Sequence, residues 1–141
     1  MPIVRFFSVE GTLSPEQRSE LVLEASRVYA GLLAAPVERI RAFVAEIPAG
    51  GAALGGELVT KDGPPVPFFE ALVLAGRPVE QRHAIISAFT DLIVEKTGME
   101  KAKVRGRCIP VDPDDWCIGG TPASVLRKGE IAARAGSDAK S

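Results

Sequence analysis

The sequence predicts an α/β (α+β) fold in which two tandem β-α-β units form a four-stranded sheet with two helices on one face. Two observations predict it. Each half of the chain combines apolar strand patterns with one amphipathic helical pattern, and landmarks of the first half recur in the second at a nearly constant offset. Because crossovers between parallel strands are right-handed, both helices are expected to cover the same side of the sheet.

The first half contains well-marked strand and helix signals. Residues 3–9 are rich in Ile, Val and Phe, which favours a strand. Ser14 and Gln17, with a proline between them, form a capping box that predicts the start of a helix, and apolar residues follow at helical spacing. Pro36 ends this helix, and residues 40–47 then favour a second strand.

The second half repeats this order, with a strand expected at 67–74, a helix at 79–96 and a strand at 103–111. The matched landmarks, 65 or 64 residues apart, are Pro2 and Pro67, Gly11 and Gly76, Arg41 and Arg105, and Gly55-Gly56 and Gly119-Gly120. A single deletion between strand and helix explains the change of offset. One face of the resulting sheet has no helix to cover it, which predicts self-association.

The chain is expected to form one domain over residues 1–141. Within it, the first unit spans 1–60, a linker with glycine and prolines spans 61–66, and the second unit spans 67–128. Residues 129–141 are mostly small and polar, and they are expected to form a flexible tail.

Composition narrows the function classes. The chain has 46% apolar and 25% charged residues and a net charge of −1, which gives no general attraction for nucleic acid or anionic lipid. No apolar run approaches the length of a membrane span, and a cytoplasmic protein is expected. Cys108 and Cys117 have no metal-ligand spacing and are expected to be reduced thiols. Neither nucleic-acid binding nor membrane binding is therefore expected.

Pro2 is the first candidate for chemistry. If Met1 is removed, as is usual before a small residue, Pro2 becomes a secondary amine at the head of an apolar strand. Partial desolvation favours the neutral form of such an amine, which can act as a base or nucleophile near neutral pH. Pro67 matches Pro2 in the repeat, but its nitrogen lies inside the chain and is an amide. The pattern therefore predicts one working proline per chain.

With these landmarks the chain resembles the tautomerase superfamily, the group that includes 4-oxalocrotonate tautomerase, and specifically its longer members in which two units are fused. Besides Pro2 and the repeat, the resemblance rests on Ala35-Pro36, Leu54-Gly55-Gly56-Glu57-Leu58 and Trp116-Cys117-Ile118-Gly119-Gly120. It implies a homotrimer without metal or organic cofactor. It also implies an amino-terminal proline that moves protons between carbon and oxygen of a small keto acid or unsaturated dicarboxylate.

The resemblance further implies roles for particular side chains. Pro2 would be the base, Arg77, Arg105 and Arg41 would hold substrate carboxylates, and Trp116 would form an apolar wall. Arg77 has support of its own, because a cation at the start of a helix opposes the helix dipole. Such a locally unfavourable choice often marks a functional position.

The first unit lacks two of these groups. Thr12 stands where the arginine would be, and Ala52 stands where the large aromatic would be. The expected site therefore takes its base from the first unit and much of its pocket from the second. Arg107 follows Arg105 by two residues and shares its strand face, so either one could be the ligand.

Three functions remain open at this point. The first is keto-enol tautomerisation with Pro2 as general base. The second is a related reaction, either dehalogenation or hydration of 3-haloacrylates or decarboxylation of malonate semialdehyde. Against it, Leu74 stands three residues before Arg77, so the close pair of arginines that these relatives use is absent. The third is a non-catalytic trimer that binds a ligand, which the absence of the first-unit groups at Thr12 and Ala52 favours.

Overall fold

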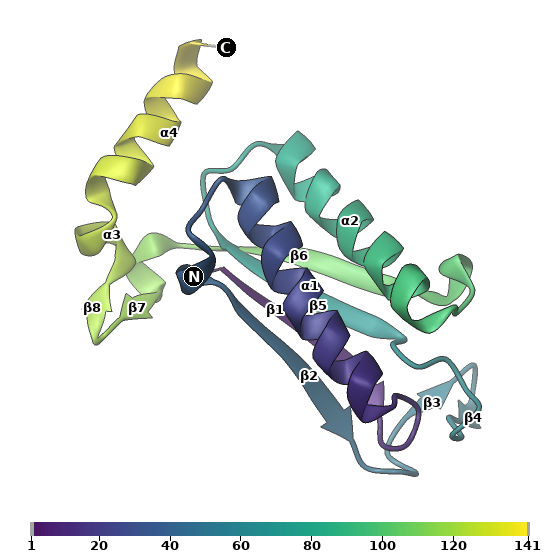
Figure 1. Cartoon of the computed structure of the whole chain (residues 1–141). Helices are drawn as coiled ribbons and strands as arrows, with labels where there is room; N and C mark the ends of the chain where they lie inside the picture. The colour runs from purple at the N-terminus through teal and green to yellow at the C-terminus, as the bar shows by residue number, and fades with distance from the viewer. Residues whose placement is uncertain (1, 141) are drawn as a thin grey trace.

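The computed structural model describes residues 2–140, with side chains through residue 136. The main strands are β1 (Ile3–Val9), β2 (Arg41–Ile47), β5 (Phe68–Leu74) and β6 (Arg105–Val111). They form a four-stranded sheet of order β2-β1-β5-β6 (Figure 1). β1 and β2 are parallel, β5 and β6 are parallel, and the two pairs meet antiparallel at β1 and β5.

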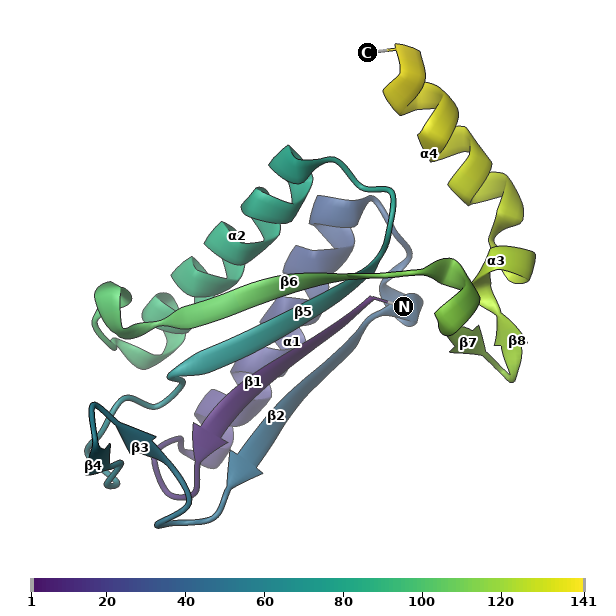
Figure 2. The ribbon, with the colours of Figure 1, turned by 180° about the vertical axis from the view of Figure 1, so that it is seen from behind.

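Two helices, α1 (Pro15–Leu33) and α2 (Val79–Thr97), cover one face of the sheet and leave the other open (Figures 1 and 2). The predicted capping box begins α1. The Ser14 hydroxyl accepts a hydrogen bond from the Gln17 N–H, and the Gln17 side chain accepts one from the Ser14 N–H. The predicted fold class is confirmed.

The remaining elements are mostly short. Two hairpins pair β3 (Ala53–Leu54) with β4 (Glu57–Leu58) and β7 (Cys117–Ile118) with β8 (Thr121–Pro122). The 3₁₀ helices are η1 (Val37–Arg39), η2 (Lys101–Lys103) and η3 (Pro113–Asp115), and the chain closes with helices α3 (Ala123–Leu126) and α4 (Lys128–Lys140). Within the described part of the chain, no helix has the length and apolar character needed to cross a membrane.

The backbone hydrogen bonds reproduce the internal repeat. The Arg41 N–H donates to the Pro2 carbonyl at 3.0 Å, and the Arg105 N–H donates to the Pro67 carbonyl at 3.1 Å. Because β1 and β5 run antiparallel, Pro2 and Pro67 lie at opposite ends of the sheet. The molecule therefore has two structurally matching ends.

The core lies between the sheet and the two helices. The rings of Phe6, Tyr29 and Phe69 surround Phe89, with centroid distances of 5.9, 4.9 and 6.0 Å. Edge-to-face contacts of this kind stabilise a core beyond the burial of their area. The Tyr29 hydroxyl donates to the Leu72 carbonyl at 2.8 Å, so this buried polar atom is satisfied. Burial raises the pKa of Tyr29.

The open face of the sheet is partly apolar and partly ionic. The buried carboxylate of Glu70 accepts hydrogen bonds from Arg5 at 2.6 Å and from Arg107 at 2.9 Å. Phe43 on β2 is 49% exposed. The bare face expected from the sequence therefore carries an ion-pair cluster beside the exposed Phe43.

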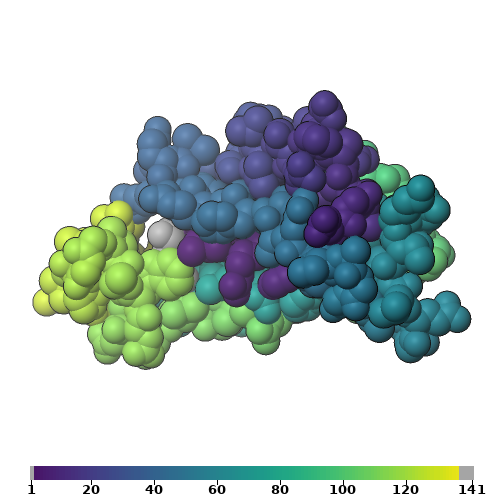
Figure 3. Space-filling view, turned by 90° about the horizontal axis from the view of Figure 1, so that it is seen from below, coloured from purple at the N-terminus to yellow at the C-terminus, as the bar shows by residue number. Residues whose placement is uncertain are grey.

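The end of the chain differs from the expectation. The sequence predicts a flexible tail over 129–141, whereas the structure has helix α4 there. Ala, Arg, Lys and Glu favour helices and are interspersed among the small residues, and Glu130 is held by an ion pair with Arg39 of η1. Figure 3 shows the C-terminal segment, in yellow-green, against the blue of the first unit at one end of the molecule.

Candidate active site

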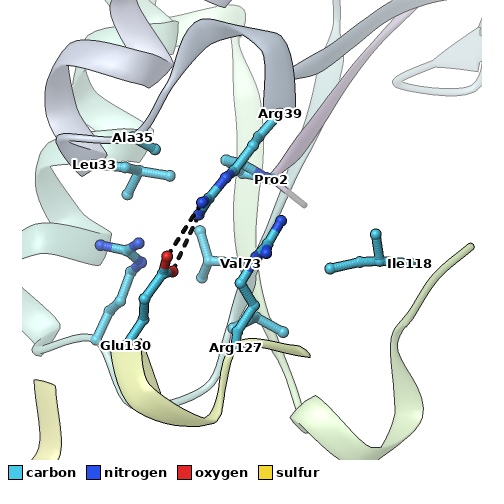
Figure 4. A pocket seen from close by; sticks show the side chains of 10 residues that line it. Pro2, Leu33, Ala35, Arg39, Val73, Ile118, Arg127 and Glu130 are labelled. Carbon is cyan, nitrogen blue, oxygen red and sulfur yellow. Dashed lines mark hydrogen bonds and ion pairs between the residues drawn. The ribbon is translucent and has the colours of Figure 1, made fainter. Parts of the chain in front are cut away.

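A narrow pocket lies at the end of the sheet where β1 begins and β5 ends (Figure 4). Its lining comes from both units and from the C-terminal segment. The pocket volume is about 30 Å³. The lining residues are Pro2, Leu33, Ala35, Arg39, Val73, Leu74, Arg77, Ile118, Arg127 and Glu130.

Pro2 is buried at the start of β1. The hydrogen bond from the Arg41 N–H fixes its carbonyl, and aliphatic side chains, among them Leu33 and Val73, line the pocket with it. Apolar surroundings and nearby guanidinium groups both favour the neutral form of an amine. This is an environment in which an amine can serve as a base near neutral pH.

Arg77 lines the same pocket from the turn between β5 and α2. Gly76 precedes it with a φ of +110°, a conformation that glycine adopts without strain. The Arg77 guanidinium donates to Gln81 at 3.2 Å, and Gln81 donates in turn to the Leu32 carbonyl at 3.0 Å. Burial lowers the pKa of Arg77, and the charge of Arg134 lowers it further. A guanidinium held in this way can bind a carboxylate through two hydrogen bonds.

The C-terminal segment adds two charged residues. Glu130 accepts two hydrogen bonds from Arg39, both at 3.1 Å, one at each carboxylate oxygen (Figure 4). This hydrogen bonding lowers the pKa of Glu130, and the charges of Arg39, Arg127 and Arg134 lower it further. Arg127 lines the pocket as well. The lining therefore carries three guanidinium groups and one carboxylate, an excess of two positive charges.

Arg41 and Trp116 are not part of this lining. The backbone of Arg41 pairs with Pro2, whereas its guanidinium donates to the Glu38 carbonyl at 3.1 Å. Trp116 is half-buried and comes two residues before the lining residue Ile118. The structure thus brings Pro2 and Arg77 into one pocket lining and leaves Arg41 and Trp116 out of it.

Arg105 lies at the opposite end of the sheet, beside Pro67. Its guanidinium donates to the Ala102 carbonyl at 2.6 Å, the same kind of contact that Arg41 makes in the first unit. Arg107 is bound to the Glu70 carboxylate. Within one chain, neither Arg105 nor Arg107 lines the Pro2 pocket.

The matching end of the molecule, at Pro67, lacks the chemical groups of the Pro2 end. The nitrogen of Pro67 belongs to a peptide bond within the chain. Thr12, which takes the place of Arg77, donates its hydroxyl hydrogen to the Val9 carbonyl at 2.7 Å. The same hydroxyl lies 3.4 Å from the Pro65 carbonyl of the linker, so the residue has a structural role at this end.

Sequence reasoning misses Arg39, Arg127 and Glu130. A signal for Arg39 exists in the repeat, because another basic residue, Lys103, occupies the matching position 64 residues later. Arg127 and Glu130 are three residues apart, a spacing that places side chains on one side of a helix. Glu130 is missed because it lies in the expected flexible tail, 129–141, and Arg127 is missed because it has no counterpart among the landmarks of the repeat.

The fold and the pocket define a class of protein in which two fused β-α-β units share one pocket around Pro2. The family model described as "Tautomerase enzyme" matches residues 2–62. The 2-hydroxymuconate tautomerase of Pseudomonas putida is 38% identical over 61 residues, which are 43% of this chain and 95% of that protein. The enzyme of the same name from Comamonas testosteroni is 36% identical over 61 residues, 43% of this chain and 97% of that protein. The chain belongs to the tautomerase family.

Solved structures extend the likeness to most of the chain. Pt0534 inactivated by 2-oxo-3-pentynoate superposes with a TM-score of 0.79 at 28% identity, covering 88% of this chain and 98% of that one. A native fused 4-OT gives a TM-score of 0.79 at 25% identity, covering 89% and 98%. The chain is therefore a tautomerase-type enzyme with the fold of the fused 4-OT proteins.

Proposed function

We propose that the protein is an isomerase that uses the amine of Pro2 as general base to move a proton between carbon and oxygen of a small keto acid or unsaturated dicarboxylate. The observation that carries this proposal is that Pro2 and Arg77 line one pocket. The proposal requires the mature chain to begin at Pro2, because a retained Met1 would acylate the nitrogen and remove its basic lone pair.

In the proposed reaction, Arg77 holds a substrate carboxylate beside Pro2. The neutral amine removes a proton from one end of the conjugated enol or keto system, and the protonated amine returns it at the other end. Guanidinium charge stabilises the negative charge that develops between the two steps. The proton that is removed is the proton that is returned, so the reaction needs no oxidant, reductant or co-reactant.

The charge of the pocket supports a dianionic substrate. Its lining has an excess of two positive charges, which matches the two carboxylates of an unsaturated dicarboxylate. The similar enzymes of Pseudomonas and Comamonas are named for 2-hydroxymuconate. This compound is therefore the first substrate to test.

The hydrolytic alternatives are less well supported. Dehalogenation and hydration add water to the substrate and would need an acidic residue free to activate that water. Glu130 is the carboxylate in the pocket lining, and hydrogen bonding to Arg39 lowers its pKa, which makes it a weaker base. These alternatives also use two arginines close together. Leu74, three residues before Arg77, stands where the second arginine would be.

The test is the variant Pro2→Ala, with the conversion of 2-hydroxymuconate followed by absorbance. We expect kcat/KM to fall by roughly 10²–10⁴-fold, the usual contribution of a general base. Pro67→Ala is the matched control, because Pro67 occupies the same backbone position at the other end, and it should keep the activity. An intact-protein mass shows whether Met1 has been removed. Undiminished activity in Pro2→Ala would rule out the proline mechanism, and an inactive wild type would favour the ligand-binding alternative.

The proposed assembly is a homotrimer built through the open face of the sheet. Exposed Phe43 on this face and the distance of Arg105 from the pocket of its own chain support it, because a neighbouring chain could receive Arg105. Light scattering of the purified protein gives the oligomeric state directly. If Pro2 and Arg105 act across chains, Pro2→Ala chains and Arg105→Gln chains refolded together should regain activity. Full activity in the Arg105→Gln protein alone would show that Arg105 is not part of the site.

A further inference from the structure

Arg39 is bound by a carboxylate of its own chain in the pocket around Pro2. Its two terminal nitrogens, Nη1 and Nη2, each donate to a different oxygen of Glu130 at 3.1 Å. This two-point arrangement is the one in which guanidinium groups recognise free carboxylates. Glu130 therefore occupies the position that a carboxylate of a bound ligand would take on Arg39 (Figure 4).

The Arg39–Glu130 pair is easily exchanged. The two side chains are 30% and 49% exposed, so that water competes with their attraction, and ion pairs with this exposure contribute little net stability. Glu130 also lies in the first turn of α4, which extends away from the sheet and from α1 and α2 (Figure 1). A small movement of this turn would release Arg39 without disturbing the core.

The size of the pocket favours such a movement. Its volume is about 30 Å³, whereas a cavity that holds benzene is on the order of 150 Å³. Pro2 and Val73 are fixed by the sheet, and Leu33 by α1. Glu130 is the lining carboxylate that stands on a segment outside these two layers, so its displacement opens the pocket and frees a cation at once.

We propose that Arg39 binds the second carboxylate of a dicarboxylate substrate, and that Glu130 occupies Arg39 in the empty enzyme and is displaced on binding. This inference rests on the proposed function, which places the first carboxylate at Arg77. A dianion exchanges with Glu130 at Arg39 and gains a new pairing at Arg77. A monocarboxylate has a single anionic group, which pairs with Arg77, so Arg39 and Glu130 determine specificity for the second carboxylate.

The test compares the binding of two unreactive six-carbon dienes, trans,trans-muconate with two carboxylates and sorbate with one, to the full chain by calorimetry at fixed ionic strength. Glu130→Gln removes the competing charge, so muconate should bind about two- to fivefold more tightly relative to sorbate, the scale of an exposed ion pair. Arg39→Gln should weaken muconate about tenfold or more, since a charged hydrogen-bond pair is lost. The double variant should bind muconate no more tightly than Arg39→Gln alone.

Glu24→Gln is the matched control, because Glu24 forms a 2.7 Å pair with Arg27 on α1, outside the pocket lining. It should leave the ratio of the two affinities at the wild-type value. Circular dichroism and thermal unfolding show that each variant is folded. Weaker muconate binding in Glu130→Gln, an equal change for both ligands, or a wild type that binds neither ligand would overturn the inference.

The outcomes separate this inference from the proposed function. If muconate and sorbate rank as expected but 2-hydroxymuconate is not converted, the proposed reaction fails and the assignment of Arg39 stands. If 2-hydroxymuconate is converted with the expected dependence on Pro2, while Arg39→Gln and Glu130→Gln leave its KM at the wild-type value, the assignment of Arg39 fails and the reaction stands.

Discussion

The ring of Phe69 packs directly over the backbone of Gly106, its partner across the parallel strands β5 and β6. A Cβ added at Gly106 would overlap that ring. In the first unit the matching partners are Val4 and Ala42. The second unit thus has a larger residue on one strand and a smaller one on the next, and the pair fills the same layer of the core.

Gly106→Ala should lower the free energy of unfolding by about 1–3 kcal/mol, the usual result of overpacking. Urea unfolding at one protein concentration measures it. Gly31→Ala is the control, because Gly31 lies inside α1 and a Cβ added there has no neighbouring atom within 4 Å. This change should be neutral or should stabilise the fold by about 0.5–1 kcal/mol. In a protein that already carries Phe69→Val, Gly106→Ala should cost less stability than it costs in the wild type, because the ring that the new Cβ would overlap is gone. Equal stabilities of the two glycine variants would contradict the packing.

Removing both arginines around Glu70 should cost more stability than neutralising Glu70 itself. Arg5→Met with Arg107→Met leaves the buried Glu70 carboxylate without its partners, a change that should cost about 1–3 kcal/mol, the penalty of an unsatisfied buried polar group. Glu70→Gln leaves two arginines that are 44% and 62% exposed within the single chain, and it should cost less. Chemical unfolding of the three proteins gives the order, and a larger loss in Glu70→Gln would reverse the conclusion.

Ser14→Ala should lower the free energy of unfolding by about 1 kcal/mol, because the first turn of α1 loses the capping hydrogen bond to the Gln17 N–H. Ser14→Gly should lose only a few tenths of a kcal/mol on the same scale. Thermal and urea unfolding distinguish the two. An unchanged stability in Ser14→Ala would show that the hydroxyl contributes nothing.

Arg77→Lys should lower kcat/KM by roughly 10–100-fold, although it keeps the charge, since lysine lacks the planar pair of donors that grips a carboxylate. Gln81→Ala should raise KM more than it lowers kcat, because Gln81 holds the Arg77 guanidinium at 3.2 Å without reaching the reacting atoms itself. Steady-state kinetics with 2-hydroxymuconate measures both. Arg27→Lys on the outer surface of α1 is the control, and wild-type kinetics in Arg77→Lys would remove Arg77 from the site.

The contribution of the Arg39–Glu130 pair to stability should disappear at acid pH. The pKa of Glu130 is lowered in the folded chain by its hydrogen bond to Arg39. A group whose folded pKa is lowered stabilises the fold above its unfolded pKa, about 4.3 for glutamate, and this contribution is lost as the pH falls through the folded value. The difference in Tm between wild type and Glu130→Gln should be present at neutral pH and vanish in acid. A difference that persists in acid would point to packing and not to charge.

Most of the fold follows from local patterns. The capping box at Ser14 and the apolar strand at residues 3–9 are short-range signals, and the elements form where the sequence predicts them. The repeat adds the second unit by the same signals. Local patterns miss the place of α4, since the contact of Glu130 with Arg39 joins residues that are far apart in the sequence.

The sequence by itself determined the two β-α-β units, the tautomerase resemblance and Pro2 as the candidate base, because each depends on the order of residues along the chain. Only the tertiary structure decided which charges share the pocket. The antiparallel meeting of β1 and β5 sets Arg77 beside Pro2 and sends Arg105 to the opposite end of the sheet. It also leaves the Pro2 end open to the C-terminal segment, which brings Arg127 and Glu130 to Arg39. The physical reason is that pairing between distant strands, not local periodicity, determines which side chains come into contact.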